Sequence, residues 1–191
     1  MSQTTKTDKP FLTDVKTLRE RARKNLSTGG VTSTYQGDVN KTIEILQSVL
    51  ATEIVCVLRY TMHAVAAQGI SSEGVRDEFA QHAKEEAGHM NEVAERINQL
   101  GGTPNFNPEG LVSRSASQYG PEKLNLVDMI RENLVAERIA VDHYRELIRY
   151  FGNDDPGTRT MLEGILVTEE EHANDMHDLL VAHEGHPMLE K

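Results

Sequence analysis

Two short stretches of the chain decide its fold: residues 86–89, with the sequence EAGH, and residues 169–172, with the sequence EEEH. Each reads Glu-x-x-His, and each follows a lone glutamate, Glu53 or Glu137, at nearly the same distance. Side chains three residues apart on a helix share one face and lie about 5–6 Å apart. Each Glu and His pair can therefore bind one metal ion. Four carboxylates and two imidazoles that converge in a helical bundle can hold two transition-metal ions.

Glycine and proline residues divide most of the chain into four long segments, at about 38–68, 73–100, 121–152 and 153–184. Within each segment apolar residues recur every three or four positions, as Ile43, Leu46 and Leu50 do, and this spacing predicts helices. We expect four helices of about 28–32 residues. Ser72 is the expected N-cap of the second helix, and the stretch before Pro156 is expected to cap the fourth.

The connections between these segments predict the topology. Turns at 69–72 and 153–155 are so short that the helices they join must be antiparallel neighbours, whereas residues 101–120 can cross the length of a bundle. We therefore predict an all-α fold, an antiparallel four-helix bundle with one long crossover. Residues 13–26 and 111–119 are expected to add short helices. The expected organisation is a basic N-terminal extension (1–37), the bundle (38–184) and a C-terminal tail (185–191).

The candidate ligands share one level of this bundle. The glutamates fall within about a residue of the midpoints of the four predicted helices, and in an antiparallel bundle these midpoints form one layer. They are Glu53, Glu86, Glu137 and Glu169. Isolated carboxylates in such a core are costly unless they are paired or bound to metal. The sequence therefore favours a metal site over four unrelated surface glutamates.

Two tyrosines repeat in the same register. Tyr60 follows Glu53 by seven residues, and Tyr144 follows Glu137 by seven, so each lies two helical turns along the same face. We expect their hydroxyl groups to form hydrogen bonds with ligand carboxylates.

Composition narrows the class of protein. No apolar run approaches the ~20 residues of a transmembrane helix, and the N-terminus lacks the apolar core of a signal peptide. A single cysteine, Cys56, excludes a disulfide framework and a Cys-x-x-Cys metal site, and we expect a cytoplasmic location. Residues 1–30 carry seven Lys and Arg against three Asp and Glu, within a total net charge of −10. The body is thus acidic, which argues against a DNA-binding core.

The run from residue 53 to residue 64, EIVCVLRYTMHA, resembles the first helix of bacterioferritins, with their ligand glutamate at Glu53, tyrosine at Tyr60 and histidine at His63. Together with both Glu-x-x-His motifs and Glu137, the resemblance spans residues 38–180. It implies a ferritin-like fold with a di-iron ferroxidase site inside each subunit. Glu86 and Glu169 would bridge the two irons. The resemblance assigns the remaining ligands in two pairs, Glu53 with His89 and Glu137 with His172.

The chain departs from bacterioferritins at two places. Their haem-ligating methionine directly follows the first bridging glutamate, where this chain has Ala87; Met90, one turn later, is expected to be a packing residue, and haem is not expected. The stretch 185–187, Gly-His-Pro, breaks the last helix early, which leaves little room for the fifth helix of 24-subunit ferritins. The long crossover and the leader are similar to the Dps type, which assembles as a dodecamer. We therefore expect a cage of twelve subunits.

The resemblance implies a ferroxidase that oxidises Fe(II) with peroxide or O2 and stores the product as a ferric mineral in a protein cage. Two other functions stay open on the ligands alone. The first is a non-cage di-metal enzyme, such as a manganese catalase. The second is a Dps-type DNA-protecting protein that uses the basic leader, although we expect this leader to fold over a neighbouring subunit. Its basic residues are Lys6, Lys9, Lys16, Arg19, Arg21, Arg23 and Lys24.

Several other polar residues are expected to lie outside the ligand set. Cys56 is expected to be a buried, inert thiol, because thiolate does not suit a carboxylate site. Glu85 lies four residues before His89 and is the one rival to Glu86. Solvated or cavity-lining roles are expected for Glu85, Glu170 and Glu171, ordinary exposure for His177, His183 and His186, and positions near the site or the inner wall for His63 and His82.

Overall fold

The structure, a computed structural model, describes residues 12–24, 26, 29–69, 72–121 and 124–184. The chain divides into two compact units, residues 1–35 and 36–191. The first unit contains α1 (Val15–Ala22), which is shorter than the helix expected over 13–26. It begins after Asp14, whose side chain accepts a hydrogen bond from the Thr17 N–H at 3.1 Å, the contact typical of an N-cap.

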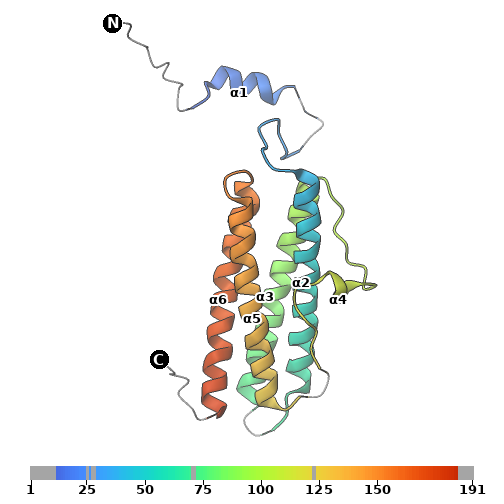
Figure 1. Cartoon of the computed structure of the whole chain (residues 1–191), viewed down its shortest axis with the longest axis vertical. Coiled ribbons are helices and arrows are strands. Elements are labelled where there is room, and N and C mark those ends of the chain that lie inside the picture. The colour runs from blue at the N-terminus through green and yellow to red at the C-terminus, as the bar shows by residue number, and fades with distance from the viewer. Residues whose placement is uncertain (1–11, 25, 27–28, 70–71, 122–123, 185–191) are drawn as a thin grey trace, which may run out of the picture. The chain divides into compact units, whose positions relative to one another are not determined.

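The second unit is the expected bundle (Figure 1). Its long helices are α2 (Val39–Ala66), α3 (Glu73–Gln99), α5 (Leu126–Phe151) and α6 (Pro156–Glu184). α2 packs along α3 and α5 along α6, and α3 also contacts α6. Among the described residues the structure contains helices and no strands. The predicted all-α bundle with one long crossover is therefore confirmed.

The helix ends follow local chemistry, not always as predicted. α6 begins at Pro156, and Asp155 accepts a hydrogen bond from the Thr158 N–H at 2.9 Å, as expected for a cap followed by proline. Ser72 is the N-cap residue of α3, as predicted, but its side chain forms no capping hydrogen bond, because its hydroxyl donates to the Gly69 carbonyl at 2.7 Å. α5 begins at Leu126 and not near Pro121, because the Asn125 side chain accepts the Asp128 N–H at 2.9 Å and sets the first turn there.

The crossover between α3 and α5 is fastened to one face of α2. It contains α4 (Leu111–Arg114), which is shorter than the helix expected over 111–119. Ser48 donates to the carbonyl of Arg114 at 2.8 Å, and Thr52 accepts the N–H of Ala116 at 2.9 Å. Further along α2, the Arg59 guanidinium is only 3% exposed and donates to the Gln118 carbonyl at 2.9 Å. These contacts satisfy the polar groups of a segment that has little regular structure of its own.

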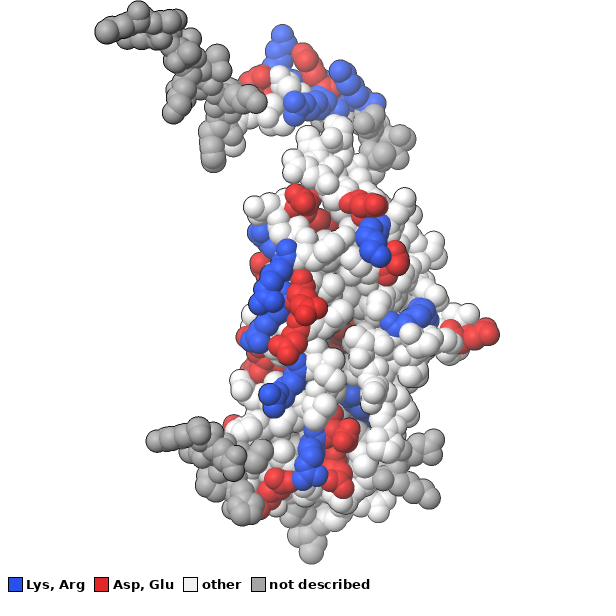
Figure 2. All heavy atoms as spheres, in the orientation of Figure 1, with Lys and Arg blue, Asp and Glu red and all other residues white. Residues whose placement is uncertain are grey.

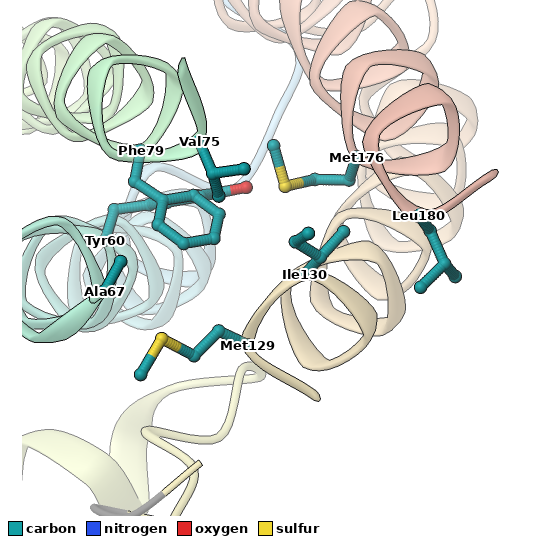
Figure 3. Close-up of a cluster of buried hydrophobic side chains, with 8 residues drawn as sticks. All are labelled: Tyr60, Ala67, Val75, Phe79, Met129, Ile130, Met176 and Leu180. Carbon is teal, nitrogen blue, oxygen red and sulfur yellow. The ribbon is translucent and has the colours of Figure 1, made fainter. Parts of the chain in front are cut away.

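Apolar side chains from all four long helices fill the part of the bundle that contains the C-terminal ends of α2 and α6 (Figure 3). The buried members of this cluster are Tyr60, Ala67, Val75, Phe79, Met129, Ile130, Met176 and Leu180. Full burial of a side chain of the size of Leu or Met stabilises a fold by about 1.5–3 kcal/mol. This cluster therefore provides a firm base for the polar layer next to it.

The described helices include none with the combination of length and apolar character that a membrane crossing requires.

Candidate metal centre

Six ionisable side chains converge at mid-height of the bundle, from all four long helices. All six are at most 6% exposed, and their carboxylate or imidazole groups point into the core. They are Glu53 from α2, Glu86 and His89 from α3, Glu137 from α5, and Glu169 and His172 from α6. These are the six residues that the sequence selected as candidate ligands, and the structure brings them together.

One group of four surrounds His89. Its Nδ1 atom lies 3.0 Å from Glu169 Oε1, 3.4 Å from Glu86 Oε2 and 3.5 Å from Glu53 Oε2. One ligand atom from each of these four residues lies within 4.8 Å of all the others. This spacing suits a single cation held by three oxygens and one nitrogen.

A second group of four surrounds His172 and shares two members with the first. It contains Glu86, Glu137, Glu169 and His172, again with ligand atoms within 4.8 Å of one another. His172 Nδ1 lies 3.6 Å from Glu86 Oε1. Because Glu86 and Glu169 belong to both groups, they occupy the position of carboxylates that bridge two ions.

The inward-facing atoms of this cluster fit a pair of divalent cations. Among the described residues, five buried ligand atoms form no hydrogen bond of good geometry, although His89 Nδ1 and Glu169 Oε1 lie at ion-pair distance from each other: Glu53 Oε2, Glu86 Oε1, His89 Nδ1, Glu169 Oε1 and His172 Nδ1. Buried polar atoms without partners destabilise a protein unless something else satisfies them. Four carboxylates carry four negative charges when ionised, and two divalent ions would neutralise them. Oxygen and imidazole donors of this kind suit iron, manganese or zinc.

The two tyrosines hold carboxylates across the bundle. The Tyr60 hydroxyl of α2 donates to Glu137 on α5, and the Tyr144 hydroxyl of α5 donates to Glu53 on α2. Both phenols are buried. Each tyrosine thus orients the lone glutamate of the other half of the chain, a choice of partner that the seven-residue spacing within one helix does not specify.

Sequence reasoning placed Glu85 off the ligand face, but its side chain supports the site from outside. Glu85 Oε2 lies 2.8 Å from Nε2 of His172, and Gln81 donates to the other oxygen of this carboxylate at 3.1 Å. A carboxylate bonded to the outer nitrogen of a ligand histidine fixes the orientation of the ring. No local sequence signal indicates this role, because it depends on the packing of α3 against α6.

The electrostatics of the cluster favour cations. Burial raises the pKa of Glu53 to about 8, and the neighbouring charge of Glu86 adds to the effect. Burial alone would lower the pKa of His89, but the carboxylates of Glu169 and Glu53 raise it to about 12. Burial would also lower the pKa of His172, but Glu86 and Glu137 raise it to about 9. In the metal-free protein these groups therefore keep their protons at neutral pH, and the binding of metal ions would release the protons.

The remaining candidate residues are spread around the bundle. Burial raises the pKa of Cys56 well above its ordinary value, so this thiol stays protonated. His63 accepts a hydrogen bond from the Asn133 amide at 3.0 Å and belongs to no candidate metal group of the described residues. His82 lies beside the site, stacked on His172 with 3.9 Å between ring centroids. Glu170 forms an ion pair with Arg145, and Glu171 is exposed. Of the three histidines near the end of the chain, His177 is exposed and His183 contacts the Leu179 carbonyl. The third, His186, lies outside the described residues.

The sequence model of the ferritin-like domain matches residues 43–184, which contain all of these ligands. The chain belongs to the ferritin-like family. The matched region contains α3, α5, α6, the crossover and all but the first turn of α2, and it agrees with the arrangement of the bundle.

Two relatives by sequence have names that refer to DNA. The DNA protection during starvation protein of Pyrococcus furiosus is 28% identical over 145 residues, 75% of this chain and 78% of that protein. The nutrient stress-induced DNA-binding protein of Synechococcus is 30% identical over 132 residues, 68% of this chain and 75% of that protein. Among solved structures, the bacterioferritin-related protein of Bacteroides fragilis, described as a dodecameric thioferritin, is 29% identical and superposes with a TM-score of 0.74 over 81% of this chain and 94% of that one. The chain is thus a Dps-like member of the family.

Proposed function

We propose that the protein is a ferroxidase that takes up Fe(II) as its substrate at a paired site within each chain and stores the product as a ferric mineral. One observation carries the proposal: two groups of four ligands overlap in the middle of one bundle and share Glu86 and Glu169. Glu53 and His89 would hold one ion, and Glu137 and His172 the other. All six ligands belong to a single chain, so the site does not need a second subunit for its completion.

The proposed reaction uses both ions at once. Two Fe(II) ions become two Fe(III) ions, and their two electrons together with two protons convert one H2O2 into two water molecules, or one O2 into H2O2. Shared carboxylates keep the ions adjacent, so both electrons can leave in one event and no free hydroxyl radical forms. Tyr60 and Tyr144 hold Glu137 and Glu53 in place for both ions. Ferritin-like di-iron proteins use this set of ligands, and the membership of the chain in the ferritin-like family supports the reaction.

We further propose that the chains form a closed cage of twelve. The dodecameric state of the similar Bacteroides fragilis protein supports this number. Mineral storage requires an enclosed space, which a closed cage provides.

We do not propose DNA binding, although one relative is named a DNA protection protein and the other a DNA-binding protein. Exposed basic side chains gather on and after α1, with an acidic side chain among them (Figure 2). They are Lys16, Arg19, Arg21, Arg23 and Lys24. On the visible face of the bundle, basic and acidic side chains alternate, and the whole chain has a net charge of −10. Retention on DNA above ~0.2 M salt would contradict this view.

The paired site is tested with a double variant, Glu86→Ala with His89→Ala. We expect the rapid oxidation of Fe(II), followed by the absorbance of ferric products after mixing with H2O2 or O2, to fall to the rate in buffer. The matched control is Glu92→Gln, an exposed acid on the same helix, which should oxidise Fe(II) at the wild-type rate. Wild-type oxidation by the double variant, with its helical content intact, would refute the site.

Storage is tested by the mass and metal content of the loaded protein. After excess Fe(II) and peroxide, analytical ultracentrifugation should show a hollow shell that carries far more than two irons per chain. A small oligomer that stops at two metals per chain would instead support a non-cage di-metal enzyme, such as a manganese catalase.

A further inference from the structure

A third group of potential ligands lies outside the paired site, between α3 and α6. It consists of Glu78 and His82 on α3 and Asp175 on α6, with one ligand atom from each within 4.8 Å of the other two. His82 Nε2 lies 3.2 Å from Glu78 Oε1 and 3.5 Å from Asp175 Oδ2. The side chains of Glu78 and Asp175 are 31% and 41% exposed, so this group opens to the surface of the bundle.

The imidazole in this group is buried and forms no hydrogen bond of good geometry within the described part of the chain. His82 is 0% exposed, and neither of its ring nitrogens has a hydrogen-bond partner among the described residues. The carboxylates of Glu78 and Asp175 both approach the same nitrogen, and a single N–H cannot donate well to both. A cation between two oxygens and one nitrogen would satisfy all three atoms, since imidazole and carboxylate are common ligands of divalent transition metals.

This group is continuous with the paired site. The ring of His82 stacks on that of His172, with an angle of 19° between their planes. Glu85 lies between the two levels: ligand atoms of His82, Glu85 and His172 also lie within 4.8 Å of one another. From the partly exposed Glu78 inward, oxygen and nitrogen donors therefore follow one another without an apolar gap as far as His172.

We propose that Glu78, His82 and Asp175 form a third divalent-cation site, through which Fe(II) passes between the surface of the bundle and the paired site. The existence of the site stands on the three side chains alone. Its role in delivering Fe(II) rests on the proposed ferroxidase function. Glu85, which contacts His172, is the carboxylate that would receive the ion on its way inward.

The other half of the chain supplies a natural contrast. At the positions that match His82 and Glu78 in register, four and eight residues before the Glu of the second motif, the chain has Ile165 and Met161. Glu92 occupies the position that matches Asp175. An acid is thus present on both halves, but only Asp175 faces a buried imidazole among the described residues. Glu92→Gln is therefore the matched control.

Binding is tested with Co(II) on the full-length protein by equilibrium dialysis and metal analysis. The double variant Glu78→Gln with Asp175→Asn should bind one Co(II) per chain fewer than the wild type, and Glu92→Gln should bind as many as the wild type. The variant Glu86→Ala with His89→Ala should lose Co(II) from the paired site and keep the third ion. In crystals soaked with Co(II), anomalous scattering should place an ion among the three side chains.

A double variant that binds as many Co(II) ions as the wild type, with no anomalous peak at His82, would overturn the third site. Its role is tested by repeated additions of Fe(II). With the oxidant already present, the Glu78→Gln, Asp175→Asn variant should oxidise each addition of Fe(II), from the first onward, about tenfold more slowly than the wild type. Equal rates throughout would refute the delivery role. A wild-type protein that does not oxidise Fe(II), while the double variant still loses one Co(II), would refute the ferroxidase proposal alone.

Discussion

The two helical hairpins of the bundle carry the same ligands but support them differently. In the first hairpin, α2 and α3, the motif is preceded by Glu85, and this carboxylate bonds to the outer nitrogen of His172 in the second hairpin. In the second hairpin, α5 and α6, the matching residue is Thr168, which offers no carboxylate to His89. Repetition of these residues thus gives two groups of candidate ligands with one shared plan and unequal surroundings. The asymmetry gives the His172 side both the supporting carboxylate and the proposed third cation site.

We expect the largest effect on metal binding from substitution of the two tyrosines, which make equivalent hydrogen bonds in the two hairpins. Tyr60→Phe removes the hydrogen bond to Glu137, and Tyr144→Phe removes the one to Glu53. A hydrogen bond to a charged group contributes about 1.5–3 kcal/mol, so each variant should bind one Co(II) about 10–100-fold more weakly. Calorimetric titration measures both affinities, with the exposed Tyr150→Phe as control. A large loss in one variant and none in the other would show that the crossed pairs are not equivalent.

A smaller effect should reveal where the halves differ. Glu85→Gln weakens the orientation of the His172 ring, and we expect about tenfold weaker binding of the Co(II) ion next to His172. Thr168→Val changes the matching position and should leave both affinities unchanged. The Co(II) absorption bands and a titration of each variant would measure this. Equal losses in the two variants would mean that Glu85 has no special role.

The smallest effect concerns the pH at which each of the two ligand histidines, His89 and His172, loses its proton. In the metal-free protein His172 should lose its proton near pH 9, while His89, with its pKa of about 12, keeps its own. Because the pKa of His172 is raised in the folded state, its contribution to stability is complete below about pH 6.5. It is lost as the pH rises towards 9, by at most about 1.4 kcal/mol per pH unit.

Nuclear magnetic resonance of the imidazole groups, together with thermal unfolding at several pH values, would measure both quantities. Saturating Co(II) should flatten the pH dependence, because the ions replace the protons. A metal-free protein whose melting temperature does not change from pH 6.5 to 9 would contradict the assignment.

The sequence predicted the parts of the structure that repeat with helical periodicity. The ligand positions follow from spacing alone, because Glu86 and His89 must share a face on any helix, and helix midpoints must meet in an antiparallel bundle. The turns at 69–72 and 153–155 predicted the hairpins for a similar reason. These inferences needed only one helix, or two adjacent helices, at a time.

The parts that the sequence did not predict depend on contacts between distant helices. Nothing in the spacing of Tyr60 indicates that its partner is Glu137 on α5 and not a residue of its own hairpin. Glu85 is off the face of its own motif, and its role appears only once α3 and α6 lie together. Local spacing predicted the N-cap position at Ser72 but not the partner of its hydroxyl, which bonds backward to Gly69 and not into the helix that follows.

Arg59, Thr52 and Ser48 hold the crossover against α2, and these contacts also affect how the chain assembles. A tether of this length, if free, would allow the two hairpins to slide past each other by a helical turn. Each anchor closes a shorter span of chain, and halving a flexible loop lowers the cost of closing that loop by about 0.6 kcal/mol. These anchors also limit the positions along α2 at which the second hairpin can pack. Glu137 therefore lies level with Glu53 before any cation binds.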